Sequence, residues 1–264
     1  MMNTESRPEG QRLYQQVGEE LRRALERGDY KIGERLPPER DIAERFNVSR
    51  SVVREAFILL ELQNLIDIRH GSGVYVTGVP APSDKSGDEE SIVRNDVGPF
   101  ELLQARQLLE SNIAAFAATQ ITKTDLVAMR AALEQEREKL SRGDTDYTAD
   151  EEFHKLIARA TQNGLMLEMV ELLWKRRLNS PMWNRLHVHI IDQGYRKKWQ
   201  QDHLAILNAL QLRDSARARQ TMWQHLENVK QTLLKLSDVD DPEFDGYLFS
   251  TNPLVPEHPL HSLD

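Results

Sequence analysis

Residues 34 to 76 read ERLPPERDIAERFNVSRSVVREAFILLELQNLIDIRHGSGVYV. A helix is expected to start at Pro37-Pro38-Glu39, because proline is tolerated in the first turn of a helix. Asn47-Val48-Ser49 breaks it, and a second helix follows from about Ser51 to Gln63, with apolar side chains at helical spacing. Alternating residues on either side of Gly71-Ser72-Gly73 then predict a β-hairpin.

A further helix is predicted upstream, from Leu13 to Arg27, because Leu13, Val17, Leu21 and Leu25 recur at nearly helical spacing. Gly28 follows its last turn, where glycine commonly ends a helix. Three helices followed by a hairpin are typical of a winged helix-turn-helix.

Residues near the start of the third helix have the chemistry of DNA recognition. An α-helix fits the major groove, and side chains near its N-terminus reach base edges there. Ser49 to Arg54 occupy this position, and no acidic residue occurs between Arg45 and Arg54. Arginine binds guanine bidentately or clamps phosphate, and serine contacts either group. The alternatives are a solvated helical hairpin and a winged helix that binds protein instead of DNA.

The 34–76 segment resembles the DNA-binding domain of the GntR family. The shared pattern is a Leu-Pro-x-Glu-Arg opening, a Val-Ser-Arg turn, Val-Arg-Glu-Ala in the recognition helix and a Gly-x-Gly wing. The resemblance implies that arginines contact bases or phosphates, that serines support them, and that the wing enters the neighbouring minor groove. The DNA-binding residues that it implies are Arg40, Ser49, Arg50, Ser51, Arg54, His70 and Gly71.

The length of 264 residues allows two domains, each with its own core. We expect the winged domain over residues 1–78 and a linker rich in Pro, Gly, Ser and charge over residues 79–97. A helical domain over residues 98–240 and a tail over residues 241–264 complete the expected organisation.

Composition excludes several kinds of chemistry. The sequence has no cysteine, which excludes disulfides, thiolate nucleophiles and cysteine zinc sites. It has no run of eighteen apolar residues and no signal-peptide core, so we expect a cytoplasmic protein without a membrane partner. Residues 1–78 carry 12 basic and 13 acidic side chains, so most of the net charge of −8 lies further along the chain. Any DNA affinity must therefore come from locally placed arginines.

Amphipathic helices separated by short breaks fill the region from Gly98 to Leu236. Strand-like alternation does not occur there, which favours a compact antiparallel bundle of six or seven helices. The predicted fold is therefore mainly α, with a winged helix-turn-helix of three helices and a β-hairpin followed by an all-α bundle.

Four polar residues lie on the apolar stripes of the helical region. Asp150 and His154 are one helical turn apart, and His203 and His225 each share a stripe with apolar neighbours. One such histidine alone is more typical of a hydrogen-bonded core residue. Together, imidazole nitrogens and a carboxylate form a ligand set for zinc, with nickel and manganese as alternatives, and they leave positions open for another ligand.

Arg106 also lies on an inward stripe, between Leu102 and Leu109. A buried guanidinium requires an anionic partner, which is either Glu110 one turn along or a small carboxylate ligand. Trp183 and Arg185 are further candidates for lining the same cavity.

The segments DEEFHKLIARATQN (150–163), DHLAILNAL (202–210) and WQHLENV (223–229) are similar to the FCD ligand-binding domain of the FadR subfamily. The resemblance implies a metal site at Asp150, His154, His203 and His225, whose shell the effector carboxylate completes. It also implies that Arg106 lies at the effector pocket.

A narrower similarity, to hexuronate regulators, is carried by SPMWNRLH (180–187), WQHLENVKQ (223–231) and FDGYLFSTNP (244–253). It implies a repressor of sugar-acid catabolism whose effector is a uronic acid or a derived aldonic acid. We expect a homodimer on an inverted-repeat DNA operator. The alternatives are a regulator of another carboxylate pathway, a metal-dependent sugar-acid enzyme fused to a DNA-binding domain, and a sensor of the metal itself.

Overall fold

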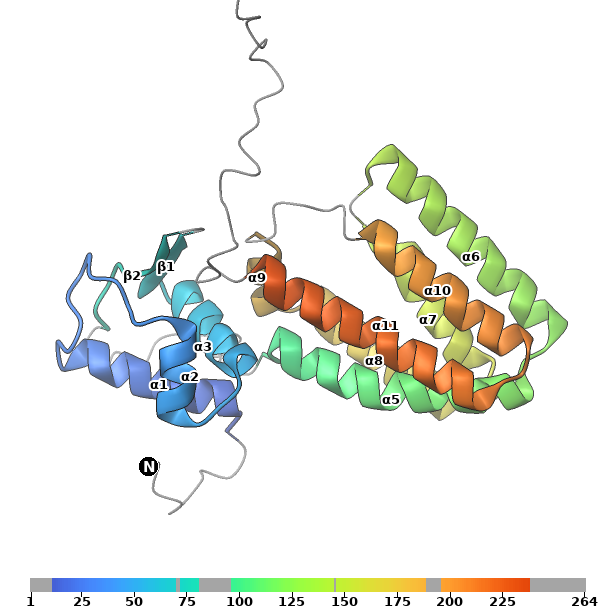
Figure 1. Ribbon diagram of the computed structural model, residues 1–264, viewed down its shortest axis with the longest axis horizontal. Coiled ribbons are helices and arrows are strands. Elements are labelled where there is room, and N and C mark those ends of the chain that lie inside the picture. The colour runs from blue at the N-terminus through green and yellow to red at the C-terminus, as the bar shows by residue number, and fades with distance from the viewer. Residues whose placement is uncertain (1–10, 70–71, 81–95, 145, 189–195, 238–264) are drawn as a thin grey trace, which may run out of the picture.

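The structure is a computed structural model that describes residues 11–69, 72–80, 96–144, 146–188 and 196–237. The first part contains three helices and two strands: α1 (Leu13–Glu26), α2 (Glu39–Phe46), α3 (Arg50–Leu62), β1 (Ile66–Arg69) and β2 (Gly73–Val76). The second part contains only helices: α5 (Pro99–Gln120), α6 (Lys123–Arg142), α7 (Thr148–Arg159), α8 (Gly164–Leu178), α9 (Pro181–Val188), α10 (Arg196–Gln211) and α11 (Ser215–Leu236). The predicted fold class, a winged helix-turn-helix followed by a helical domain, is confirmed (Figure 1).

The winged part has a core of its own, in which apolar side chains of α1, α2 and α3 meet those of the hairpin. The break between α2 and α3 occurs at Asn47, whose φ of 53° is left-handed and ends α2. Asparagine tolerates this conformation better than most residues. The strands β1 and β2 pair antiparallel, with Ile66 opposite Val76 and Ile68 opposite Val74. Both of these pairs face the core, as the alternating pattern predicts.

The wing contains one position where glycine is required. Gly73 has a φ of +106°, and a Cβ atom there would lie 2.2 Å from Nε of Arg35. A side chain at this position would therefore be strained and would also displace Arg35.

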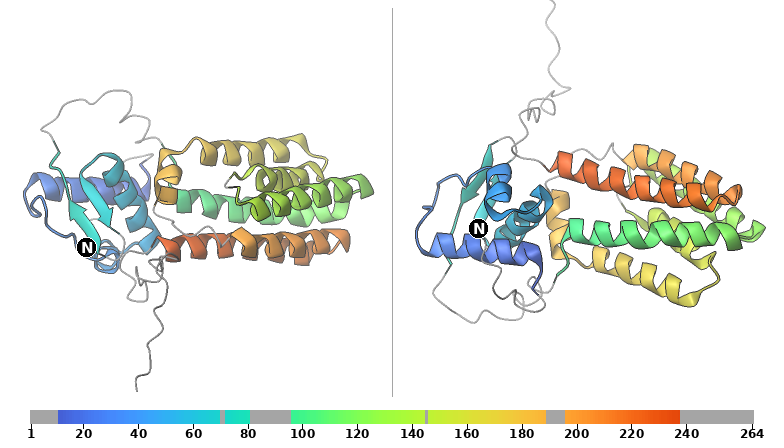
Figure 2. Two further views of the ribbon diagram at one scale, coloured as in Figure 1. Left: turned by 90° about the horizontal axis from the view of Figure 1, so that it is seen from above. Right: turned by 60° about the horizontal axis from the view of Figure 1, so that its bottom comes forward.

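The helical part is an elongated bundle of seven helices, counted over the described residues. The two longest, α5 and α11, run side by side along it (Figures 1 and 2). Of the other helices, α7 packs against α5, α6 and α8, and α10 packs against α6 and α11. Aromatic and aliphatic side chains fill its centre, and Phe153 and Trp174 are completely buried there. The loops between successive helices are short, as an antiparallel bundle requires.

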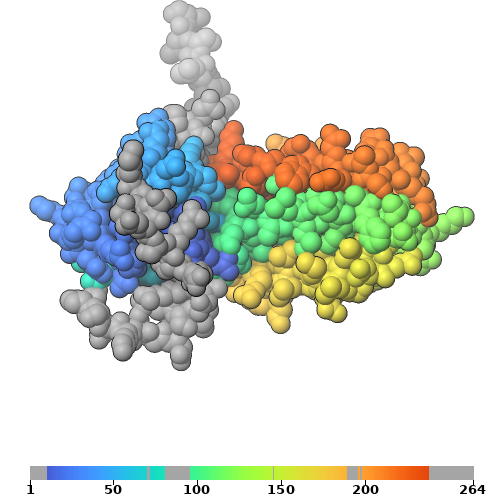
Figure 3. Space-filling model, turned by 90° about the horizontal axis from the view of Figure 1, so that it is seen from below, coloured from blue at the N-terminus to red at the C-terminus, as the bar shows by residue number. Residues whose placement is uncertain are grey.

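The winged part contacts one end of the bundle, where α5 begins and α11 ends (Figure 3). Tyr14, Ile58 and Leu59 belong to the same hydrophobic cluster as the bundle core. The Tyr14 hydroxyl also donates to the backbone oxygen of Asp96 over 2.8 Å. The two parts are thus joined by a packed interface as well as by the chain.

Across the described residues, no helix combines the length and the apolar character that a membrane span needs.

Candidate metal centre, effector pocket and DNA-binding face

The structure brings together the four predicted metal ligands, which come from three helices. Asp150 and His154 lie one turn apart on α7, His203 lies on α10 and His225 on α11. One ligand atom of each residue lies within 4.8 Å of the others. The three histidines are buried, so the cluster lies inside the bundle.

The Nε2 atoms of the histidines converge with the carboxylate of Asp150. His154 Nε2 is 3.4 Å and His203 Nε2 is 3.5 Å from Asp150 Oδ1, and the Nε2 atoms of His203 and His225 are 3.2 Å apart. His154 Nε2 is buried without a hydrogen-bond partner among the described residues. Such a buried polar atom is costly unless something binds it.

Each histidine has a carboxylate next to its other ring nitrogen, Nδ1. Glu110 of α5 hydrogen-bonds to His154, and Glu136 of α6 lies 2.9 Å from His203 Nδ1. Asp202 of α10 lies 3.5 Å from His225 Nδ1. A carboxylate at Nδ1 places the ring proton there and leaves Nε2 free to coordinate a metal.

The electrostatics favour the ligand form of Asp150 and His225, whereas Glu110 and Asp150 outweigh burial and raise the pKa of His154. Burial alone raises the pKa of Asp150, but the neighbouring His154 and His203 outweigh burial and hold this pKa below its usual range. Burial and the neighbouring His203 lower the pKa of His225 to about 3. Asp150 is therefore ionised and His225 neutral at neutral pH, as metal coordination requires.

The donor set of three imidazoles and one carboxylate suits zinc, nickel or manganese. Four protein ligands leave coordination positions open, and two of the four, Asp150 and His225, also line a pocket. The residues present therefore fit the metal that the sequence predicts.

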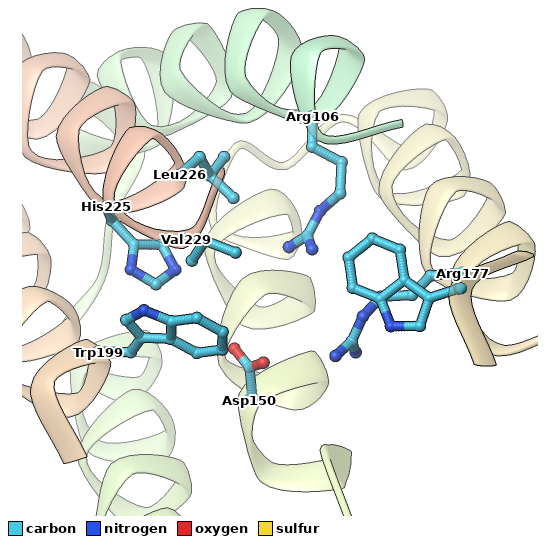
Figure 4. A pocket seen from close by; sticks show the side chains of 8 residues that line it. Arg106, Asp150, Arg177, Trp199, His225, Leu226 and Val229 are labelled. Atoms are coloured by element: carbon cyan, nitrogen blue, oxygen red, sulfur yellow. The ribbon is translucent and has the colours of Figure 1, made fainter. Parts of the chain in front are cut away.

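A small, partly open pocket lies beside the cluster. Arg106 and Arg177 line the pocket together with polar groups of the cluster, and aromatic and aliphatic side chains cover the rest of its wall. Figure 4 shows the lining side chains directed into the pocket. The complete lining is Arg106, Asp150, Arg177, Trp183, Trp199, His225, Leu226 and Val229.

Arg106 is paired with Glu110, the first of its two expected partners, and it also lies at the pocket. Its Nε donates to Glu110 Oε1 over 2.6 Å, and its side chain also lines the pocket. Burial raises the pKa of Glu110, but Arg106 and His154 outweigh burial and lower this pKa to about 2. Glu110 is therefore a charged bridge between the pocket arginine and a cluster histidine.

The other two predicted effector residues have different positions. Trp183 of α9 is buried and lines the pocket. Arg185, two residues further along α9, is absent from the described lining, and its Nε donates to Glu61 of α3 over 2.9 Å. Residues two apart on a helix point in different directions, which accounts for the separation.

Sequence reasoning missed four groups at this site, one of which is Asp202. Helical spacing could have found the other three. Arg177 follows buried Val170 and Trp174 at i, i+4 and i+7 on α8. Trp199 precedes His203 by one turn, and Glu136 follows buried Met129 and Leu133 at the same spacing on α6.

The predicted DNA-binding residues of α2 and α3 are mostly exposed. The Arg40 side chain is 75% exposed and that of Arg50 is 48% exposed. Ser49 precedes the first turn of α3, and its hydroxyl is 2.8 Å from the Ser51 hydroxyl. His70 and Gly71 lie outside the described residues.

Arg54 differs from the other predicted DNA contacts, because its side chain is only 3% exposed. Both sides of its guanidinium bind the carboxylate of Glu39 on α2. Its Nη1 donates to the backbone oxygen of Leu234 over 2.9 Å and to the hydroxyl of Ser237 over 2.5 Å. Arg54 is thus held at the end of α11, and in this arrangement it does not face solvent.

Two further contacts join α3 to the bundle. The Glu55 carboxylate accepts hydrogen bonds from the backbone N–H groups of Phe100 and Glu101, over 2.7 and 2.9 Å, at the start of α5. Glu61 pairs with Arg185 of α9. The predicted recognition helix is therefore fastened to three helices of the second domain.

Comparison with known proteins agrees with both parts of this description. The family model described as "Bacterial regulatory proteins, gntR family" matches residues 13–76, and the model described as "FCD domain" matches residues 101–228.

Curated relatives match over nearly the whole chain. The chain is 49% identical to the Uxu operon regulator of Haemophilus influenzae, over 92% of this chain and 90% of that protein. It is 51% identical to the Uxu operon transcriptional regulator of Escherichia coli, over 92% and 95%. It is 45% identical to the Exu regulon transcriptional regulator of E. coli, over 94% and 95%.

These relatives are transcriptional regulators and not enzymes. The winged part with its exposed arginines and the helical part with its buried cluster correspond to the two matched families. The chain belongs to the GntR family of bacterial transcriptional regulators and carries an FCD domain.

Proposed function

We propose that the chain is a DNA-binding repressor of hexuronate-catabolism genes and that a small sugar acid bound at a metal ion in the FCD domain controls it. The observation that carries the proposal is the buried Asp150–His154–His203–His225 cluster, which opens into a pocket lined by arginine. A bound metal would supply a Lewis acid for a carboxylate oxygen. The Uxu and Exu names of the relatives support hexuronate genes as the target.

The residues of the pocket have distinct tasks in this proposal. Asp150 and the three histidines hold the metal. Arg106 pairs with the effector carboxylate, and Glu110 keeps the Arg106 side chain in place. Trp183 covers one side of the ligand. Arg50, Arg40 and the serines at the start of α3 contact the operator, with His70 and Gly71 in the adjoining minor groove.

The contacts of α3 provide a route from the pocket to DNA. The effector pocket lies among α5 and α7 to α11. The start of α5 contacts α3 through Glu55, and the end of α11 contacts α3 through Arg54. A ligand changes the DNA affinity only if it binds two inter-domain arrangements with different affinity. In the arrangement seen here Arg54 is withheld from DNA, so we assign it to the state with lower operator affinity.

Two copies are proposed to act together on an inverted repeat. Leu108 and Phe116 of α5 and Trp223 of α11 are large apolar side chains that are at least 40% exposed. Because α5 and α11 lie side by side, these residues are the surface that we propose for a second copy.

The test is an electrophoretic mobility shift with the promoter regions of hexuronate genes, with the metal supplied and with glucuronate, galacturonate or their aldonates added. We expect a specific shift that one sugar acid reverses and that Arg50→Ala abolishes. Arg137→Ala is the matched control, because Arg137 is exposed on α6 and pairs only with Glu134 among the described contacts. A wild-type protein without any specific shift at low salt would contradict the proposal.

A metal assay separates the proposal from a pure metal sensor. At saturating metal, a sensor of the ion itself would not respond to sugar acids, whereas the proposed repressor releases its operator when the acid is added.

A further inference from the structure

The outer face of the wing carries charged side chains that have no part in the proposed function. Asp67 of β1 pairs with Tyr75 of β2, Arg69 pairs with Gly73, and Arg35 forms a further antiparallel bridge to Tyr75. The isoleucine and valine residues that alternate with them on the two strands are buried in the core. Because side chains alternate along a strand, these five residues share the opposite face of the wing.

The backbone holds Arg35 against β2. On one side of Arg35 the Leu36 N–H donates to the backbone oxygen of Val74 over 2.8 Å, and on the other the Val76 N–H donates to that of Glu34 over 2.9 Å. Arg35 and Tyr75 are thus a non-hydrogen-bonded pair, in which opposite side chains come close together. The Arg35 side chain therefore starts from a fixed position at the edge of the wing.

The Arg35 guanidinium lies beside the turn of the hairpin. A Cβ atom at Gly73 would be 2.2 Å from Nε and 2.7 Å from Cζ of Arg35, so the guanidinium fills the space that a side chain at Gly73 would need. Gly73 and Arg69 are the last pair of the two strands before the turn. Arg35 thus starts at Tyr75 and brings its charge to the turn end of the wing.

Tyr75 and Arg69 make the rest of this face rigid. The Tyr75 hydroxyl is 2.9 Å from the Ser72 hydroxyl and donates to the Ser72 backbone oxygen over 3.2 Å. The guanidinium carbon of Arg69 lies 4.5 Å from the centre of the Tyr75 ring, and its Nε donates to Asp67 over 2.8 Å. The charge of Asp67 is therefore balanced by Arg69.

The charge on this face suits an anionic ligand. Of the residues that the register places there, Arg35 and Arg69 are basic and Asp67 is acidic, which leaves an excess of positive charge. Arg35 is exposed to solvent, so a ligand can reach it. A guanidinium presents two parallel N–H groups to a phosphate, which makes phosphate the ligand that best suits this position.

DNA provides phosphates at the corresponding place. In the proposed function the turn of the wing enters the minor groove, which is about 6 Å wide in B-DNA. Phosphates line both edges of this groove, so a cation beside the inserted turn lies next to one of them. Contacts to phosphates position a protein on the duplex but carry no sequence information directly.

We propose that Arg35 binds an operator phosphate at the edge of the minor groove that the wing enters. This inference rests on the proposed function and adds to it a DNA contact from outside α2, α3 and the turn of the wing. Gly73 permits the contact, because the absence of a side chain there lets the guanidinium lie beside the turn. Arg35 contributes affinity for DNA in general and does not choose the operator sequence.

The test is a fluorescence-anisotropy titration of the full chain, without effector, at several salt concentrations. The two DNA probes are a promoter fragment of hexuronate genes and an unrelated duplex of equal length. Arg35→Gln should lower the affinity for both probes by a similar factor, about tenfold, because a hydrogen bond to a charged group is lost. It should also reduce the slope of log affinity against log salt concentration by about one in each protomer. Arg35→Lys should keep the slope of the wild type, because it keeps the charge.

Arg23→Gln is the matched control, because Arg23 is an exposed arginine of the same domain that pairs with Glu20 within α1. Its affinity and slope should equal those of the wild type. An unchanged slope in Arg35→Gln, or a loss of affinity confined to the promoter fragment, would overturn the inference while leaving the proposed function intact. A wild type that binds neither probe would overturn both.

The salt slope keeps the test decisive if part of the variant protein is inactive. An inactive fraction lowers the apparent affinity by the same factor at every salt concentration, so it leaves the slope unchanged. The loss of a phosphate contact changes the slope, and a purely structural role of Arg35 does not.

Discussion

At the scale of single residues, the cluster is organised by the carboxylates around it. Glu110, Glu136 and Asp202 each lie next to the Nδ1 atom of one histidine. They come from three helices that also pack against the cluster, so each ring is oriented by a neighbouring element. The free Nε2 atoms then point to one place, which is the arrangement that a metal requires.

We expect Glu136→Gln to weaken zinc binding about tenfold to a hundredfold, because the neutral amide no longer supports the His203 ring as a carboxylate does. Competition with a chelating dye measures this affinity. Glu134→Gln, on the exposed side of α6, is the control and should leave the affinity unchanged. A change of less than about threefold in Glu136→Gln would contradict the assigned role of Glu136.

Glu55 makes the stability of the protein depend on pH. Burial raises the pKa of Glu55 to about 8, above its usual value of 4.5, despite the hydrogen bonds from Glu101 and Phe100. The fold thus favours the protonated form, so this contribution to stability is complete below about pH 4.5 and is lost as the pH rises through about 8.

Glu55→Gln removes this dependence, because the amide oxygen still accepts the two N–H groups but does not ionise. We expect the melting temperature of the variant, relative to the wild type, to rise between about pH 6 and about pH 9. Thermal unfolding at both pH values measures the difference. A difference that does not change with pH would show that Glu55 does not titrate in this range.

The four cluster residues could be predicted because polar side chains on apolar stripes are conspicuous. Glu136 lies on a stripe as well, but α6 is rich in charge, and an acidic residue in such a helix usually faces solvent. Arg54 and Arg185 carry the same chemistry as the exposed arginines, and only the packing of one domain on the other brings Arg54 to Ser237 and Arg185 to Glu61. Periodicity within one helix contains no information about such contacts.

At the scale of elements, α11 connects the two functional regions. Its middle carries His225, and its C-terminal end accepts Arg54 at Leu234 and Ser237. The last carbonyl groups of a helix lack partners within the helix and carry partial negative charge, so they attract a guanidinium. A shift of α11 at the pocket would therefore act directly on α3.

Ser237→Ala removes one of the contacts that hold Arg54. We expect it to raise the operator affinity in the absence of effector a few-fold, because less energy is then needed to turn Arg54 toward DNA. Titration of labelled operator by fluorescence anisotropy measures the change.

Thr221→Ala is the control for Ser237→Ala. Both hydroxyls bond to a backbone oxygen four residues earlier in α11, but only Ser237 also contacts Arg54. An unchanged or lower operator affinity in Ser237→Ala would show that the end of α11 does not compete with DNA for Arg54.

The elements themselves followed from local patterns. Breaks at Asn47, Gly143 and Asn163 separate helices as expected, because two of these residues adopt left-handed φ and the third caps the next helix. The predicted six or seven helices of the second part are seven in the described residues. Their arrangement around the cluster required tertiary contacts between segments that are far apart in sequence.

At the scale of the whole molecule, most of the net negative charge lies outside the winged part. The net charge of −8 repels DNA in general, so affinity depends on the exposed arginines of α2 and α3. Operator affinity should therefore fall steeply as salt rises, because each phosphate contact releases counterions.

We expect Arg40→Ala to reduce the slope of log affinity against log salt concentration by about one in each protomer, as the loss of one phosphate contact requires. Arg137→Ala, at an exposed position of α6 in the second domain, should leave the slope unchanged. An unaltered slope in Arg40→Ala would mean that this side chain does not contact phosphate.

The three contacts of α3 with the second domain limit the exchange of whole winged domains between regulators of this kind. Arg54, Glu55 and Glu61 lie on the predicted recognition helix α3 and bind α11, α5 and α9. A winged domain grafted from another regulator would bring DNA specificity but not these partners, and the chimaera would bind its operator without obeying the effector. New specificity in this architecture must therefore arise by substitutions around α3 that spare these three residues, rather than by exchange of whole domains.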